Sequence, residues 1–281
     1  ILLTLGIAAV LLLPAQTDAR ENGAQIPAAA ALPVSENTGQ ALPRQLTPLV
    51  DTRTADNGYI SVTYYAPQGK YKVLIEKDSE RYVYDLLADN STQSFPLQMG
   101  DGDYTVGVME NIGGNEYRYL TQDTVTAAME ELSVYLAPVQ MMEWEGLSEA
   151  AAVLTENADT DREKIEAIYG YVVTHIAYDE EKIDDLGPGY LPDPVVTLRE
   201  QSGICYDFAS LMGSLCRASG IPARLIKGYA DTVEGYHAWN EVYCDGAWII
   251  VDTSYDAQMH DMGNPYDMEK AKDIYEAIKI Y

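Results

Sequence analysis

The stretch QSGICYDFASLMGSLCRASGIPARLIKGY, residues 201–229, decides the fold and the chemistry expected of this chain. It places Cys205 directly after a turn that contains Gly203 and in the first turn of a predicted helix. Gly220 and the following Ile-Pro pair end this helix. The apolar spacing gives the helix one buried stripe, formed by Phe208, Leu211, Met212 and Leu215.

A cysteine in this position has a direct chemical use. The N-terminal end of a helix carries about half an elementary positive charge, which favours a thiolate over a thiol. The free N–H groups there can also donate to a developing oxyanion. A cysteine at a helix start is more often structural when it stands alone. The hypothesis that Cys205 is a nucleophile therefore depends on the residues that follow it.

The segment YHAWNEVYCDGAWIIVDTSYD, residues 236–256, predicts a β-hairpin around the turn dipeptide Asp245-Gly246. A two-residue turn pairs Cys244 with Ala247, and the same register continued outward places His237 opposite Ser254. Since side chains alternate between the two faces of a sheet, His237 and Asp252 are predicted to be diagonal neighbours on one face. A single-residue bulge would break this inference.

A thiol at a helix start, with an imidazole and a carboxylate on one face of the next hairpin, makes up an activated nucleophile. Cys205 would attack, His237 would take its proton, and Asp252 would orient the imidazole. Each residue has an ordinary structural alternative when considered singly. The hypothesis gains its strength from the combination, because the chain has three histidines and no other such set.

These motifs resemble the transglutaminase-like superfamily, the papain-related cysteine enzymes. The matching features are Gly-x-Cys opening a helix, Gly-Ile-Pro-Ala-Arg after it, His-Ala-Trp, and Asp-Thr ending the second strand, within about residues 150–256. The resemblance implies a papain-like α+β core with Cys205 as nucleophile, His237 as general base and acid, and Asp252 as orienter. The chain is similar in particular to exported bacterial members that carry a β-sandwich ahead of the catalytic domain.

The resemblance also implies an oxyanion hole. Its first donor would be the backbone N–H of Cys205, and its second an upstream Gln, Trp or Tyr side chain. Tyr190 and Gln201 are the candidates, and their spacing neither decides between them nor rules out that both are loop residues. Trp239 is a candidate for a wall of the substrate site, with ordinary core packing as the alternative.

The charge of the chain limits its partners. With 18 basic and 44 acidic residues the formal net charge is −26, which disfavours binding to nucleic acid and to anionic lipid. The chain has no CxxC or HExxH pair, so no metal and no cofactor is expected. The acidic loop 179–185 either attracts a basic acceptor or is only solvated surface.

Residues 1–19, ILLTLGIAAVLLLPAQTDA, have the pattern of a secretory signal peptide whose basic n-region is missing. An uncleaved anchor is the alternative, and either interpretation predicts a secreted or cell-surface protein whose membrane contact is limited to this segment. The chain has three cysteines, too few and too uneven in number for a disulfide-built domain. A bond between Cys216 and Cys244 remains open.

We predict four regions, namely a signal peptide at 1–19, a flexible linker at 20–50, a β-sandwich at 51–140 and a catalytic domain at 141–281. Seven short β-rich runs separated by turn signals suggest an immunoglobulin-like sandwich, at residues 58–67, 71–78, 81–87, 93–99, 103–111, 116–125 and 132–138. A capping box at Thr160 and Glu163 begins a further helix. Residues 178–201 are expected to form an ordered loop, and residues 257–281 a short helix without an assignable role.

The predicted fold class is therefore α+β, with a papain-like or transglutaminase-like catalytic domain after an all-β sandwich. The predicted function is cysteine-dependent acyl transfer on peptide or glutamine amides through a thioester, as a protease, amidase or transglutaminase. The partner would be a protein or peptide substrate, and association with a cell wall stays open. The alternative is a non-catalytic binding module at the cell surface with a residual triad.

Overall fold

The structure of the chain is a computed structural model that describes residues 47–66, 68–187 and 189–281. The predicted signal peptide and nearly all of the predicted linker lie outside the described residues. Strand β1 (Leu49–Asp51) begins just inside the range predicted as linker. In the part of the chain that is described, none of the helices combines the length and apolar character that crossing a bilayer requires.

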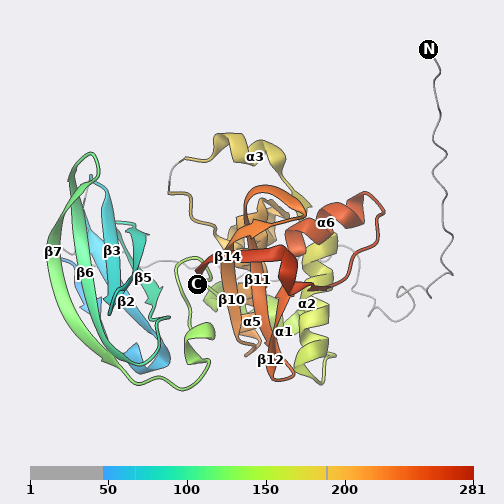
Figure 1. The fold of residues 1–281 in the computed structure, drawn as a ribbon, viewed down its shortest axis with the longest axis horizontal. Helices are drawn as coiled ribbons and strands as arrows, with labels where there is room; N and C mark the ends of the chain where they lie inside the picture. Colours follow the sequence, from blue (N-terminus) through green and yellow to red (C-terminus); the bar gives the residue numbers. More distant parts are fainter. Residues whose placement is uncertain (1–46, 67, 188) are drawn as a thin grey trace, which may run out of the picture. The chain divides into compact units, whose positions relative to one another are not determined.

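The first part of the described chain forms two antiparallel sheets (Figure 1). One sheet has the order β1-β2-β5 and the other β4-β3-β6-β7. Strand β2 shows why these segments form a sandwich, because Ile60, Val62 and Tyr64 are buried on one face while their neighbours in sequence face outward. The further strands are β2 (Tyr59–Tyr65), β3 (Tyr71–Lys77), β4 (Glu80–Leu86), β5 (Asp89–Pro96), β6 (Gly102–Gly113) and β7 (Glu116–Ala127).

Six of the seven predicted strands correspond to β2 through β7. The seventh prediction, residues 132–138, is wrong. This segment forms a short 3-10 helix, η3 (Ser133–Tyr135), and Leu132 before it has a left-handed backbone with φ of 71°. Further 3-10 turns are η2 (Ala55–Asn57), η4 (Glu145–Leu147) and η5 (Lys272–Ile274).

The second part of the chain combines helices with one antiparallel sheet, in which the last strand in sequence lies beside the first. The sheet has the order β13-β12-β11-β10-β14. Its strands are β10 (Ala223–Ala230), β11 (Val233–Cys244), β12 (Ala247–Val251), β13 (Glu269–Lys270) and β14 (Tyr275–Ile280). The helices are α1 (Ser148–Leu154), α2 (Asp161–His175), α3 (Glu180–Asp185), α4 (Pro194–Glu200), α5 (Cys205–Ala218) and α6 (Thr253–Asp261).

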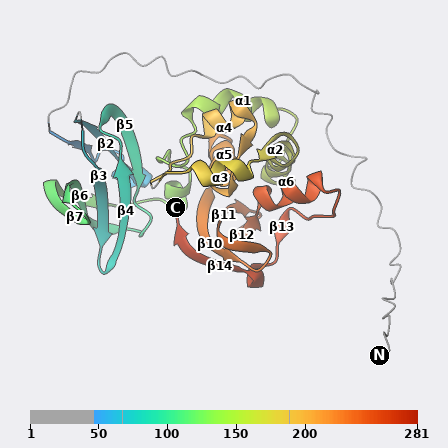
Figure 2. The same cartoon turned by 90° about the horizontal axis from the view of Figure 1, so that it is seen from above.

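Helix α5 is the centre of this α+β domain. It packs on β10 and β11 with one side, and α1, α2, α4 and α6 contact it from the others (Figure 2). The predicted stripe is confirmed, because Phe208, Leu211, Met212 and Leu215 are each fully buried. Two polar side chains that α5 buries donate to backbone carbonyls, Ser210 Oγ to Met141 at 2.7 Å and Arg217 Nη1 to Ala137 at 2.6 Å.

Two expectations for connecting segments need correction. The predicted loop 178–201 contains the helices α3 and α4, and each begins at an aspartate whose side chain accepts backbone N–H groups, Asp179 and Asp193. Most of the C-terminal segment is not helical, because β14 adds to the edge of β10, from Ile226 paired with Ile280 to Ala230 paired with Tyr275. Pairing with the sheet outweighs the helical composition of this segment.

The hairpin register is confirmed over the ladder itself. Cys244 pairs with Ala247, and the register continues to Asn240 paired with Val251. Asp245 and Gly246 both have positive φ, of 52° and 83°, as the predicted two-residue turn requires. All three cysteines are free, so the disulfide left open between Cys216 and Cys244 is absent.

The central position of α5 predicts a large stability effect on truncation. We expect Leu211→Ala to lower the free energy of unfolding by roughly 2–5 kcal/mol, because it opens a cavity at a fully buried site. Val153→Ala, at a helical residue that is 44% exposed, is the control and should change it by less than about 0.5 kcal/mol. Urea unfolding followed by tryptophan fluorescence measures both, and equal effects would contradict the central role of α5.

Candidate active site

Cys205 occupies the first position of α5, and a close backbone approach shapes the turn before it. A Cβ added at Gly203 would lie 2.5 Å from the Cβ of Asp207, so this position requires glycine. Asp207 is fully buried, and its Oδ2 accepts the backbone N–H of Ile204 at 2.9 Å and the Lys182 ammonium at 2.7 Å. This carboxylate therefore ties the start of α5 to α3.

A short parallel strand pair places a tyrosine beside Cys205. Strand β8 (Ala177–Tyr178) pairs with β9 (Ser202–Gly203), with Tyr178 opposite Gly203. The backbone N–H of Cys205 donates to the Tyr178 hydroxyl. Burial, together with the nearby Cys205, raises the pKa of Tyr178 to about 12, so its hydroxyl keeps its proton at neutral pH.

His237 and Asp252 are both buried and in contact. His237 Nε2 lies 2.8 Å from Asp252 Oδ2. The predicted pairing of His237 with Ser254 is wrong, since the ladder ends at Val251 and Asp252 becomes the N-cap of α6. Asp252 thus reaches the imidazole from the N-cap of α6 and not from a strand. The predicted contact between the His237 ring and the Asp252 carboxylate is nevertheless present.

The imidazole also forms a side-chain hydrogen bond with Cys205. Because Nε2 contacts the carboxylate, Nδ1 is the ring nitrogen left for the sulfur. Burial lowers the pKa of His237, but the hydrogen bonds and charges of Asp252 and Cys205 outweigh burial and raise it above its usual range. This environment favours the protonated, imidazolium form of the ring.

The Asp252 carboxylate is fully buried and has donors on both oxygens. Oδ2 accepts the Tyr275 hydroxyl at 2.9 Å in addition to the imidazole. Oδ1 accepts the Tyr255 backbone N–H and the Ser254 hydroxyl, each at 3.1 Å. Burial raises the pKa of Asp252, but the bonds to His237, Tyr255 and Tyr275 outweigh it and lower the pKa below its usual value.

One further cation lies near the sulfur. Lys227 on β10 interacts electrostatically with Cys205, and burial lowers the pKa of this lysine to about 8. Its ammonium lies 3.3 Å from the centroid of the Tyr206 ring. Within the residues described, no group of three or more His, Cys, Asp or Glu side chains is arranged to hold a metal ion.

The three secondary candidates from the sequence lie elsewhere. The Tyr190 hydroxyl donates to Asp207. The Gln201 side chain is hydrogen-bonded to Tyr171. Trp239 is 1% exposed and packs behind the imidazole, with ring centroids 6.1 Å apart. Their side chains are therefore engaged away from the position beside the sulfur, and Tyr178 is the residue that sequence reasoning missed.

Residues 148–253 match the family model of the transglutaminase-like superfamily. The chain carries a transglutaminase-like domain. The matched range begins at α1 and ends one residue after Asp252, so it contains the nucleophile turn of α5 and the hairpin.

Several individual proteins are similar to this chain. This chain is 30% identical to human (Homo sapiens) Kyphoscoliosis peptidase over 142 residues, or 47% of this chain and 21% of that protein. The Mus musculus protein of the same name is 30% identical over 126 residues, which are 41% of this chain and 19% of that protein. The chain therefore spans about a fifth of the length of these curated relatives.

Two solved structures are similar at lower identity. A proposed cysteine protease from Cytophaga hutchinsonii is 20% identical, with a TM-score of 0.41, and the match covers 75% of this chain and 73% of that one. The periplasmic domain of TgpA from Pseudomonas aeruginosa is 15% identical, with a TM-score of 0.37, and the match covers 78% of this chain and 97% of that one.

The electrostatics of the site predict selective alkylation. We expect iodoacetamide at pH 6 to label Cys205 before Cys216 and Cys244, because an imidazolium lies beside Cys205 while burial raises the pKa of the other two thiols. Asp252→Asn removes the carboxylate that raises the His237 pKa, so labelling at pH 6 should slow more than tenfold. Mass spectrometry of tryptic peptides measures each site, and equal rates at all three cysteines would contradict the ion pair.

Proposed function

We propose that this protein is an exported, cysteine-dependent acyl-transfer enzyme that acts on peptide or glutamine amides. The observation that carries the proposal is the chain of contacts from Cys205 through the His237 ring to the buried Asp252 carboxylate. A nucleophile, a base bonded to it and a group that orients the base are the parts such catalysis needs. Export is supported by the apolar pattern of residues 1–19.

In the first half of the reaction, Cys205 Sγ attacks the amide carbon as a thiolate and the carbonyl oxygen becomes an oxyanion. The His237 imidazolium gives its proton to the amine, the C–N bond breaks, and a thioester forms. In the second half, water or a primary amine attacks the thioester while His237 takes its proton, and the sulfur leaves. Water yields an acid and an amine yields a new amide.

The oxyanion hole is proposed to consist of the Cys205 backbone N–H and the Tyr178 hydroxyl. The Tyr178 hydroxyl accepts the Cys205 N–H in the free protein, and the substrate oxygen would replace it as acceptor of that N–H and also accept its O–H. The raised pKa of Tyr178 keeps the hydroxyl a donor across the physiological range. Donors placed where negative charge develops lower the barrier more than they stabilise the bound substrate.

The function is tested with Cys205→Ala. Wild type and variant are incubated with a protein mixture and a labelled primary amine, and the products are analysed by mass spectrometry. We expect new peptide ends if water is the acceptor, or label incorporation if the amine is, and both should be lost in the variant. Cys216→Ala, at a buried cysteine within the core, is the matched control and should keep activity. Identical products with wild type and Cys205→Ala would favour the binding-module alternative.

Tyr178→Phe tests the oxyanion donor. We expect kcat to fall by about 100-fold to 1000-fold, because one donor to the developing charge is removed. The alkylation rate of Cys205 at pH 6 should change less than threefold, since the bond between His237 and Asp252 is untouched. A variant that keeps its kcat would exclude this role for Tyr178.

A further inference from the structure

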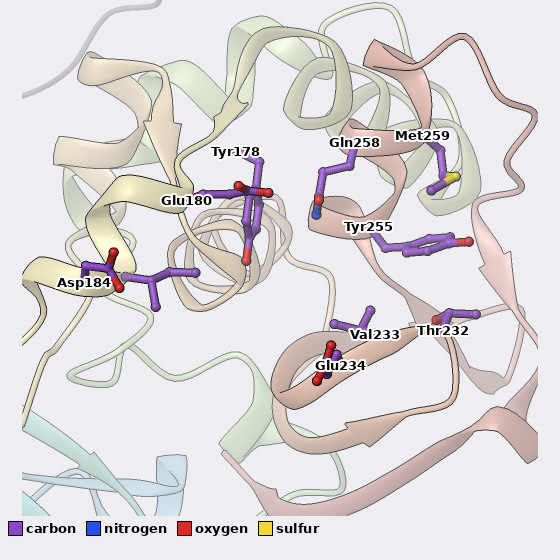
Figure 3. Close-up of a pocket in the computed structure, with 10 residues that line it drawn as sticks. Tyr178, Glu180, Asp184, Thr232, Val233, Glu234, Tyr255, Gln258 and Met259 are labelled. Atoms are coloured by element: carbon purple, nitrogen blue, oxygen red, sulfur yellow. The ribbon is translucent and has the colours of Figure 1, made fainter.

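A cavity of about 570 Å³ opens next to the proposed catalytic residues. Figure 3 shows side chains from three sides of it, contributed by β8 and α3, by the turn into β11, and by α6. The residues that line it are Tyr178, Glu180, Ile183, Asp184, Thr232, Val233, Glu234, Tyr255, Gln258 and Met259.

The cavity shares its walls with the site of chemistry. Tyr178 lines it, and the hydroxyl of this residue accepts the backbone N–H of Cys205. Tyr255 also lines it, and its backbone N–H donates to Asp252. Atoms of a substrate in this cavity would therefore lie within a residue or two of the reacting carbonyl.

The charged groups of the cavity are all of one sign. Glu180, Asp184 and Glu234 contribute carboxylates, and lysine and arginine are missing from its lining. None of these three carboxylates has an ion-pair partner among the residues that the structure describes. The neighbouring Lys182 cannot neutralise them, because its ammonium is bound to the buried Asp207.

Apolar surface lies between these charges. Ile183, Val233 and Met259 and the ring of Tyr255 supply it. Ile183 is 48% exposed, so its side chain is available for contact with a ligand in the cavity. A long side chain with an apolar stem and a cationic end fits such a lining, since the methylenes contact the walls while the charge meets the carboxylates.

We propose that this cavity binds a lysine or arginine side chain of the substrate, close to the amide that reacts. The proposal rests on the proposed function, because it assigns a substrate class to the same site. The site is the open cavity that Tyr178 and Tyr255 line, and its carboxylates set which side chains it accepts. Glu180, Asp184 and Glu234 are therefore specificity-determining residues that do not take part in bond making.

The proposal is tested with a set of peptide substrates that share one reactive amide. Each position around this amide carries in turn lysine, arginine, norleucine or glutamate, and kcat/KM is measured for each peptide. We expect wild type to prefer lysine and arginine over norleucine by about tenfold at one position, in 20 mM salt. Exposed ion pairs are individually weak, so the three carboxylates are expected to act together. The preference should shrink in 0.5 M salt because exposed charges are screened.

The triple variant Glu180→Gln, Asp184→Asn, Glu234→Gln should lose the preference while its kcat/KM on the norleucine peptides stays within threefold of wild type. Glu181→Gln is the matched control, since it removes a charge from the same helix at a residue outside the lining. A wild type without preference for basic residues, or a triple variant that keeps it, would overturn the proposal. So would a preference for lysine without arginine, because lysine would then act as the attacking amine.

A binding measurement tests the proposal for the cavity independently of the proposal for catalysis. Fluorescence anisotropy of the labelled lysine and norleucine peptides on Cys205→Ala protein requires no catalysis. Tighter binding of the lysine peptide, lost in the triple carboxylate variant, supports the cavity even if no peptide is ever turned over. Equal affinity for both peptides overturns the cavity proposal and leaves the catalytic proposal to its own test.

Discussion

The buried carboxylate of Asp252 is the interaction on which the domain depends. An ionised carboxylate without water is strongly unfavourable unless donors replace the lost hydration. Here four donors do so, and they come from β11, from the first turn of α6 and from β14. One charge therefore holds together the central sheet, a helix and the C-terminal edge strand. The same set of bonds orients the His237 ring toward the sulfur, so stability and site geometry have a common origin.

A second buried carboxylate plays the corresponding part beside Cys205. Asp207 accepts the N–H before Cys205, the Lys182 ammonium and the Tyr190 hydroxyl, and its close approach leaves no room for a side chain at Gly203. The helix start and the segment that carries α3 are consequently fixed to each other. The start of α5 and the helix that carries Glu180 and Asp184 are thus joined through a single buried carboxylate.

The parts of this arrangement that depend on local pattern could be predicted from the sequence. The helix stripe, the Asp-Gly turn and the ladder as far as Val251 follow from spacing alone, whereas the placement of Asp252 as the N-cap of α6 does not. Tyr178 and Tyr275 could not be found in this way, because each reaches the site through a strand pairing distant in sequence, β8 with β9 and β14 with β10. In a chain with 22 tyrosines, residue type gives no signal for either.

The negative charge of the chain acts differently at the surface and in the interior. Charges exposed to salt water are screened over about 8–10 Å, so most of the 44 acidic residues have little influence on the sulfur. Asp252 is shielded from solvent, and its field on the imidazole is therefore much stronger than that of any exposed neighbour. Glu180, Asp184 and Glu234 remain hydrated and cannot perturb the ring in this way. In the proposed enzyme their effect would fall on what enters the cavity, so burial would separate the residue that supports catalysis from the residues that set selectivity.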